Sequence, residues 1–278
     1  MQALVSVKNL DISFLQDGLQ THVVKGISFD IFPKEILAIV GESGSGKSVT
    51  ALSLTKLLPP APYCEVQGDI IYESNQPILK LSERKLRKIR GAGIAYIFQD
   101  PASSFNPLFT IGYQIAEAIK LHISDVDDVK ACAIQLLHKV GLEDADRCYK
   151  SYAHEMSGGM LQRAMIAMAL ACRPKILIAD EPTTALDVTI QKQIIDLLKN
   201  LQRTEELTVV LITHNFGIIN DFAQRVLVMF SGKIVEAGET KQILMHPQHP
   251  YTKALIACIP RLGQRKQRLE TIDYSSFK

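Results

Sequence analysis

One segment of the sequence, Gly41–Ser48, carries residue types suited to holding a chain of phosphates. It reads GESGSGKS and matches the pattern G-x-x-x-x-G-K-[ST]. Glycines permit backbone conformations that turn successive N–H groups inward toward an anion. Lys47 adds a positive charge for the β- and γ-phosphates, and the Ser48 hydroxyl suits Mg²⁺, which prefers oxygen ligands. The segment therefore predicts a site for ATP with magnesium, formed by Gly41, Ser43, Gly44, Ser45, Gly46, Lys47, Ser48 and Val49.

The neighbours of this segment favour a phosphate loop over a plain glycine-rich turn. The preceding run, Ile36–Val40, is wholly apolar, as expected for a strand buried on both faces. The following segment, Lys47–Leu58, has helical spacing and stops at Pro59. A phosphate loop requires this order of strand, turn and helix.

Two acidic residues, Asp180 and Glu181, follow a second apolar run, Ile176–Ala179. On their own they would mark the exposed start of a loop. Beside a phosphate loop, Asp180 is expected to hold magnesium and Glu181 to polarise the attacking water as a general base. These two motifs predict a P-loop NTPase, but they leave kinase, GTPase, motor and transporter ATPase open.

A second candidate for holding an anion is Ser157-Gly158-Gly159, which comes just before the helical run Leu161–Ala171. Ser157 is a good N-cap, and the two glycines leave the first N–H groups of the helix uncovered. Helix starts of this kind bind anions. From this segment alone, a plain capped helix is an equally good interpretation.

The wider pattern predicts an α/β fold. Strands are expected at Leu4–Val7, around Ile27, Phe29 and Ile31, and at Ile36–Val40, Ile94–Phe98, Ile176–Ala179, Thr208–Ile212, Val226–Met229 and Ile234–Ala237. Strands that alternate with helices on both sides of a helical stretch imply a mainly parallel sheet with helices on its faces. We predict a P-loop NTPase (RecA-like) core, an N-terminal antiparallel β subdomain and an inserted α-helical subdomain at about 101–160.

Two helices are predicted together with their apolar faces. The first has Ser124 and Asp125 as candidate caps, and its face carries Val129, Ala133, Leu136 and Val140. The face of the second carries Ile190, Ile194, Leu197 and Leu201.

Composition gives no support for a nucleic-acid-binding protein, a membrane-spanning chain, or a fold held by disulfides or zinc. The chain has 278 residues with a net charge of only +2, which gives no argument for a nucleic-acid partner. Its longest uninterrupted apolar run, Ala164–Cys172, is far shorter than the roughly 20 residues of a membrane span. The cysteines number five and form no C-x-x-C pair, which indicates free thiols rather than a disulfide framework or a zinc site.

The order of these motifs resembles the nucleotide-binding subunits of ABC transporters. That order is the phosphate loop, Gln99 after a strand, the Ser157–Gly159 segment, the acidic pair, Ala185-Leu186-Asp187, and His214 after a strand. The resemblance implies that the phosphate loop of one subunit and the Ser-Gly-Gly helix of another clamp the same ATP, in a head-to-tail dimer.

The resemblance also assigns roles to single residues. Gln99 is expected to contact magnesium and the attacking water, and His214 to contact the γ-phosphate. Asp187 is expected at the dimer seam, and Phe14 is expected to stack on adenine. Taken alone, Phe14 would be a core residue and His214 a structural histidine, so these roles depend on the whole ordered set.

A narrower resemblance is to the dipeptide, oligopeptide and nickel importer ATPases. It rests on Gln99–Pro107, Ile111, Gly112, Gln114 and Met160, and on the tail from His246 to Leu255, HPQHPYTKAL. It implies a nucleotide-binding domain at 1–245 and a C-terminal extension at 246–278. The two His-Pro pairs of the extension are interpreted as turns rather than as metal ligands.

This resemblance predicts an ATP-hydrolysing subunit that powers uptake of di- or oligopeptides. Its expected partners are a second ABC ATPase, in a heterodimer rather than a homodimer, two membrane permease subunits and, indirectly, a solute-binding protein, with no nucleic acid. Its expected place is peripheral, at the cytoplasmic face of the cell (inner) membrane. The alternatives are a nickel importer ATPase, an ABC ATPase of translation or DNA repair, and a small-molecule P-loop kinase.

One residue departs from the family pattern. Asn215 follows His214, where aspartate is usual. The departure puts in question a hydrogen bond that supports His214, and it leaves the prediction of nucleotide binding untouched.

Overall fold

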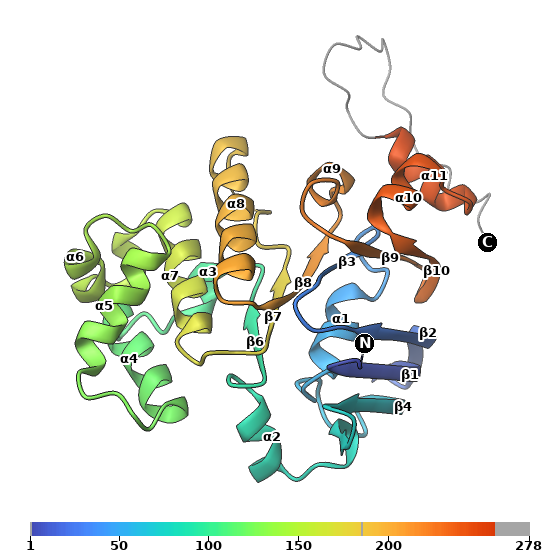
Figure 1. Cartoon of the computed structure of the whole chain (residues 1–278). Helices are drawn as coiled ribbons and strands as arrows, with labels where there is room; N and C mark the ends of the chain where they lie inside the picture. The colour runs from blue at the N-terminus through green and yellow to red at the C-terminus, as the bar shows by residue number, and fades with distance from the viewer. Residues whose placement is uncertain (1, 185, 259–278) are drawn as a thin grey trace. The chain divides into compact units, whose positions relative to one another are not determined.

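The computed structural model describes residues 2–184 and 186–258, which fall into two compact units (Figure 1). Unit 1 comprises Met1–Lys80 and Leu211–Lys278, and unit 2 comprises Leu81–Val210. The elements of unit 1 are β1 (Val5–Gln16), β2 (Leu19–Ile31), β3 (Ile36–Val40), α1 (Lys47–Ser53), β4 (Cys64–Tyr72), β5 (Gln76–Pro77), the 3-10 turn η1 (Ile78–Lys80), α9 (Phe216–Ile219), β9 (Arg225–Phe230), β10 (Lys233–Glu239), α10 (Thr240–Met245) and α11 (Pro250–Ala257).

The elements of unit 2 are α2 (Glu83–Ile89), β6 (Ile94–Ile97), α3 (Pro101–Ser104), α4 (Ile111–His122), α5 (Val129–Lys139), α6 (Ala145–Lys150), the 3-10 turn η2 (Ala153–Glu155), α7 (Gly158–Leu170), β7 (Ile176–Asp180) and α8 (Val188–Thr204). The boundary between the units falls within β8 (Thr208–Thr213). The predicted division at 245/246 stays a prediction, and residues 259–278 of the expected extension lie outside the described part of the chain.

The N-terminal part of unit 1 is an antiparallel sheet with the strand order β2-β1-β4-β5. Val5 and Val7 of β1 lie opposite Ile31 and Phe29 of β2. Ile27, Phe29 and Ile31 are all buried, because alternate residues of a strand share one face. The predicted antiparallel β subdomain is therefore confirmed.

Unit 1 also contains a parallel pair of strands, β3 and β9, to which β10 adds an antiparallel edge. Every residue of β3 is buried, as its apolar run predicts. A carboxylate–guanidinium contact from Arg225 Nη1 to Glu35 Oε1, 2.9 Å long, fixes the starts of β9 and β3 beside one another. Ser231 and Gly232, with φ values of 50° and 83°, form the turn between β9 and β10.

Unit 2 contains a second parallel pair, β6 and β7, in which Ile94 lies opposite Ile176. Between these strands the chain is helical, and α4, α5, α6 and α7 pack against one another. With parallel pairs in both units and a helical stretch between β6 and β7, the predicted α/β class with a mainly parallel sheet is confirmed.

Some local predictions need correction. The helix predicted over Lys47–Leu58 ends at Ser53, because Lys56 takes a left-handed φ of 54° and the N–H of Leu57 bonds back to the carbonyl of Leu52 at 3.0 Å. This is a Schellman ending, which satisfies the last carbonyls of the helix. Asp128, rather than Ser124 or Asp125, caps α5 by accepting the Ala131 N–H.

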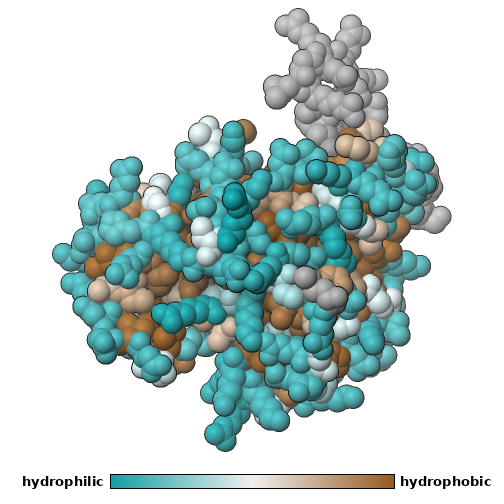
Figure 2. Space-filling model, viewed as in Figure 1, coloured by the Kyte–Doolittle hydropathy of each residue, from teal (hydrophilic) through white to brown (hydrophobic). Residues whose placement is uncertain are grey.

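The buried faces of two helices are also rotated slightly from those predicted. In α5 the most buried positions include Leu137 in place of Leu136, and in α8 they include Leu198 in place of Leu197. Among the described residues, no helix is both long and apolar enough to cross a bilayer. The face drawn in Figure 2 is covered mainly by hydrophilic side chains, with apolar ones in scattered patches.

Candidate functional site

The predicted phosphate loop connects β3 to α1 in unit 1. Gly41 has a φ of 156°, and a Cβ at this position would lie 2.2 Å from the Met229 carbonyl oxygen. Gly46 has a φ of 100°, and its Cβ would lie 3.1 Å from the Val23 carbonyl oxygen. Neighbouring backbone leaves no room for a Cβ at Gly41, and at Gly46 the left-handed φ favours glycine.

Lys47 lies inside the loop and is only 4% exposed. Its ammonium group donates to the carbonyl oxygens of Gly41, at 2.9 Å, and Glu42, at 2.7 Å. These two bonds hold a positive charge within the curve of the loop, where a phosphate chain needs it.

Ser45 provides a test of whether this loop fits an anion. Its hydroxyl is buried and has no hydrogen-bond partner among the described residues. Leaving a buried hydroxyl unsatisfied costs about 1–3 kcal/mol, so the loop favours an occupant that accepts this hydrogen bond. Phosphate oxygens accept such bonds, and the loop therefore fits the ATP that its sequence predicts.

The predicted base, Glu181, comes directly after β7 in unit 2. It has a φ of 46°, a left-handed conformation that is uncommon for a residue with a Cβ. Its Oε2 accepts hydrogen bonds from Thr184 Oγ1, at 2.8 Å, and from Gln99 Nε2, at 3.3 Å. Two hydrogen-bond donors thus hold the Glu181 carboxylate. The left-handed backbone of Glu181 is strained, and such a conformation is kept only where the surrounding structure stabilises it.

Of these two donors, the sequence predicted only Gln99, which follows β6. Because β6 and β7 are a parallel pair, residues that follow both strands lie at the same sheet edge. Thr184 was missed. Its only sequence signal is that it lies three residues beyond Glu181, where a hydroxyl in a turn can reach back to the carboxylate.

Ser157 and Asp187 cap two helices of unit 2. Ser157 Oγ accepts the Met160 N–H at 3.4 Å at the start of α7, and Asp187 Oδ1 accepts the Ile190 N–H at 3.0 Å at the start of α8. Ser157, Gly158 and Asp187 are exposed. A Cβ at Gly158 would make only an ordinary contact, at 3.6 Å from Leu186 Cδ2.

The remaining predicted residues lie in unit 1. Phe14 is half-buried in β1, opposite Thr21 of β2 and Cys64 of β4. His214 is exposed and directly follows β8. The Asn215 side chain caps α9 by accepting the Gly217 N–H at 2.9 Å, so this position serves the start of a helix.

The predicted site residues are therefore divided between the two units. Unit 1 carries the phosphate loop together with Phe14 and His214, and unit 2 carries Gln99, Ser157, Gly158, Gly159, Asp180, Glu181 and Asp187. Within unit 2 the structure brings Gln99 and Glu181 into contact. The roles of these residues stay predictions.

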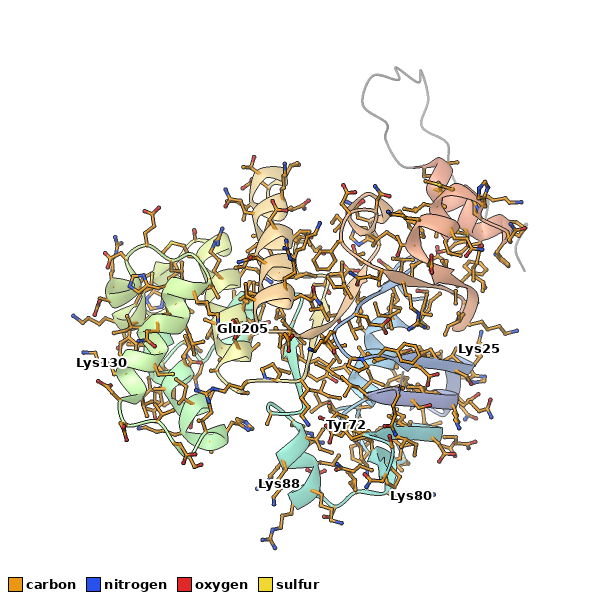
Figure 3. All side chains as sticks on the ribbon, viewed as in Figure 1. Lys25, Tyr72, Lys80, Lys88, Lys130 and Glu205 are labelled. Atoms are coloured by element: carbon orange, nitrogen blue, oxygen red, sulfur yellow. The ribbon has the colours of Figure 1, made fainter. Side chains whose placement is uncertain are left out.

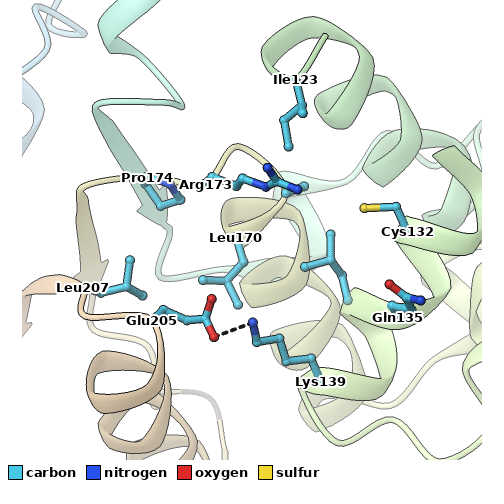
Figure 4. A pocket seen from close by; sticks show the side chains of 11 residues that line it. Ile123, Cys132, Gln135, Lys139, Leu170, Arg173, Pro174, Glu205 and Leu207 are labelled. Atoms are coloured by element: carbon cyan, nitrogen blue, oxygen red, sulfur yellow. Dashed lines mark ion pairs between the residues drawn. The ribbon is translucent and has the colours of Figure 1, made fainter. Parts of the chain in front are cut away.

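A cavity of about 500 Å³ in unit 2 contains none of these residues (Figure 4). Its wall includes apolar side chains such as Leu170 and Leu207 and an ion pair between Lys139 and Glu205. The predicted site residues thus lie on loops and at helix starts rather than in this cavity.

The three buried cysteines, Cys64, Cys148 and Cys172, are poorly suited to act as nucleophiles or metal ligands. Burial raises the pKa of Cys64 and Cys148 above the usual value, and it raises the pKa of Cys172 to about 11. Because the thiolate is the nucleophile and metal ligand, these buried residues act as small apolar side chains.

Comparison with known proteins defines the class. Residues 24–184 match the ABC transporter family, and residues 235–276 match a family described as oligopeptide/dipeptide transporter, C-terminal region. The chain belongs to the ABC transporter family, and it is an ATPase of that family.

Two curated relatives narrow the comparison. The chain is similar to the dipeptide transport ATP-binding protein DppD of Bacillus subtilis (strain 168), at 47% identity over 98% of this chain and 82% of that protein. It is also similar to the glutathione import ATP-binding protein GsiA of Escherichia coli (strain K12), at 49% identity over 95% of this chain and 43% of that protein. The chain thus spans less than half of the second relative.

Solved structures agree with the family. A dimeric post-hydrolysis state of the ATP-binding cassette MJ0796, bound to ADP and Pi, has a TM-score of 0.74 and 28% identity, over 85% of this chain and 98% of that chain. CbiO1 of Clostridium perfringens, part of the ABC transporter complex cbiONQ, has a TM-score of 0.74 and 26% identity, over 88% of this chain and 92% of that one.

Proposed function

We propose that this chain is the ATP-hydrolysing subunit of an importer for di- or oligopeptides, at the cytoplasmic face of the cell (inner) membrane. The observation that carries the hydrolytic part is the Glu181 carboxylate, fixed by Gln99 and Thr184 directly after a buried strand. A carboxylate held in this way is suited to orient a water molecule and accept its proton. Support for a peptide cargo comes from the C-terminal region match and from the names of both relatives, since glutathione is itself a short peptide.

In this proposal the nucleotide site combines several groups. The phosphate loop from Gly41 to Val49 holds the phosphates, Phe14 stacks on adenine, and His214 contacts the γ-phosphate. Ser48, Gln99 and Asp180 offer the hydroxyl, amide and carboxylate oxygens that suit Mg²⁺. When bound, the ion would offset the charge that develops on the transferring phosphoryl group.

A second ATPase subunit completes the site in this proposal. Ser157 and Gly158 are exposed at the start of α7, so another molecule can reach them. The Ser157–Gly159 segment of one subunit covers the γ-phosphate held by the other, and Asp187 lies at the seam. The MJ0796 cassette, which is described as dimeric, supports this arrangement. We infer a heterodimer with a related ATPase. Loss of the γ-phosphate removes contacts across the seam and opens the dimer.

An exposed apolar surface in unit 2 is the proposed contact with membrane permeases. Leu108 is 78% exposed, and the rings of Phe109 and Tyr113 stack at 4.7 Å. Gln114 fastens the segment before α4, because its amide nitrogen donates to the Asn106 and Phe109 carbonyls. The segment follows Gln99 in sequence, and in this proposal it carries the movement at the nucleotide to the permeases.

Transport by the reconstituted complex tests this proposal. The chain is assembled in proteoliposomes with two permease subunits, the second ATPase and the solute-binding protein of the same transport system, and ATP-dependent uptake is measured for a labelled dipeptide, glutathione and Ni²⁺. We expect uptake of a peptide that stops when Glu181→Gln replaces the wild-type chain. Uptake of nickel alone, or ATP hydrolysis that drives no uptake, would contradict the peptide assignment.

A further inference from the structure

A tyrosine far along the chain contacts the phosphate loop. Tyr251 lies in the first turn of α11 and its side chain is completely buried. Its hydroxyl accepts a hydrogen bond from the backbone N–H of Glu42, at 3.0 Å. Glu42 is the second residue of the phosphate loop, and both residues belong to unit 1. A residue of the tail therefore bonds to the backbone that is expected to hold ATP.

Several contacts fix Tyr251 in this position. Its ring packs against Phe230, the last residue of β9, with centroids 4.3 Å apart. Its own N–H donates to His249 Nδ1 at 3.2 Å. The Glu236 carboxylate of β10 accepts the N–H groups of Gln248, at 2.7 Å, and His249, at 3.0 Å.

Glu236 is ionised when it makes these bonds. Burial alone would raise its pKa, but the hydrogen bonds from the N–H groups of Gln248 and His249 hold the pKa below its usual value. The start of α11 is thus fastened to β10 by charge-assisted hydrogen bonds, which are stronger than neutral ones.

The contact between Tyr251 and Glu42 is connected to Lys47 by one peptide group. The Glu42 N–H and the Gly41 carbonyl belong to the same peptide unit, which is planar and rigid. Tyr251 accepts from one side of this unit, and Lys47 Nζ donates to the other, at 2.9 Å from the Gly41 oxygen. Fixing the N–H therefore also fixes the direction of the carbonyl that holds the lysine.

We propose that Tyr251 is a positioning residue for ATP binding: its hydroxyl holds the Gly41–Glu42 peptide so that the loop presents Lys47 to the phosphates. The proposal rests on the ATP-binding role of the phosphate loop and extends it to the C-terminal extension. In this proposal Tyr251 acts through the Gly41–Glu42 peptide and makes no contact of its own with the nucleotide.

The variant Tyr251→Phe tests the hydroxyl while keeping the ring packed on Phe230. We expect the Kd for MgATP and the KM for ATP to rise between about twofold and about tenfold, the effect of one hydrogen bond. We expect kcat to stay near the wild-type value, because Glu181 is unchanged. Amide hydrogen exchange in residues 41–47 should also become faster.

Tyr72→Phe is the matched control, since it removes the hydroxyl of another buried tyrosine of unit 1, in β4 (Figure 3). We expect a similar change in Tm for both variants, with nucleotide affinity altered only by Tyr251→Phe. Unchanged affinity in Tyr251→Phe, or an equal loss in Tyr72→Phe, would overturn the proposal.

Two further variants separate this inference from the function on which it depends. Lys47→Ala must lose MgATP affinity, and failure of the wild-type chain to bind MgATP would refute the function itself. Glu236→Ala loosens the start of α11, and we expect a smaller rise in Kd than with Tyr251→Phe. In the double variant the two effects should be less than additive, because both act through the same hydroxyl. Fully additive effects on Kd would contradict the proposal that Glu236 acts through the Tyr251 hydroxyl.

Discussion

The phosphate loop of unit 1 and the segment after β7 in unit 2 are held in place by different kinds of group. The loop presents backbone groups, so its shape depends on glycines and on side chains that bond to its peptides, those of Lys47 within the loop and Tyr251 outside it. The segment after β7 presents a side chain, Glu181, which depends on its own left-handed backbone and on two donors.

This difference indicates a division of labour. Changes in the groups that shape the loop should alter nucleotide affinity, whereas changes in the groups around Glu181, or at the exposed start of α7, should alter turnover. Variants in the two regions test this separation of nucleotide binding from turnover.

Glu181→Gln should have the largest effect. The amide keeps the size of the side chain but cannot accept a proton from water, so we expect kcat to fall by about 10²- to 10⁴-fold. Nucleotide affinity should remain, because the phosphate loop is unchanged. Steady-state ATPase assays and MgATP binding measure the two quantities, with the exposed Glu143→Gln of the same unit as control. Wild-type turnover in the Glu181→Gln variant would show that Glu181 is not the general base.

Lys47→Ala should have the opposite effect to Glu181→Gln, since it should weaken nucleotide binding rather than slow the hydrolytic step. Charge-assisted hydrogen bonds contribute about 1.5–3 kcal/mol, so we expect MgATP affinity to fall about 10- to 100-fold. Calorimetric titration measures the loss, and Lys8→Ala, at an exposed position of β1, is the control. If affinity is retained and only turnover falls, the loop does not bind phosphate in the way proposed.

Gly158→Asp tests the exposed start of α7. A side chain fits there without a clash, so the variant should fold. Its carboxylate would face the γ-phosphate held by the second subunit, and we expect the ATPase rate of the assembled complex to fall about tenfold or more. MgATP affinity of the isolated chain should not change. Gly158→Asn, which has the same size without the charge, should lose less. Equal losses in both variants would point to steric effects rather than to a phosphate nearby.

Asn215→Asp should have the smallest effect. Either side chain can accept the Gly217 N–H and cap α9, so we expect the free energy of unfolding to change by less than about 0.5 kcal/mol, with turnover unaltered. Thermal unfolding and the ATPase rate check this. A severalfold rise in turnover would mean that position 215 supports His214 after all.

The sequence predicted the parts of this structure that local patterns determine. The all-apolar run of β3, the alternation in β2 and the glycine-lysine loop were found because each needs only neighbouring residues. The end of α1 was misplaced, since Lys56 carries no glycine-like signal for its left-handed conformation. The cap of α5 was placed at Ser124 or Asp125 because several nearby residues could have served equally well.

Contacts between distant residues were the least predictable. Tyr251 and Glu42 are 209 positions apart, and no local pattern connects them. The His249-Pro250 pair was interpreted as a turn, but His249 caps α11 and Pro250 opens it, because the first turn of a helix tolerates proline. The pairing of Gln99 with Glu181 depended on β6 and β7 being neighbours, which the sequence implied only through the resemblance.

A second subunit is proposed to complete the nucleotide site, and hydrogen exchange at Ser157–Gly159 tests this role most directly. Exchange is measured with and without MgATP, in the isolated chain and in the assembled complex, with Glu181→Gln used to prevent hydrolysis. We predict that ATP slows exchange at these three residues only in the complex. Slowing in the isolated monomeric chain, or no change in the complex, would contradict the claim.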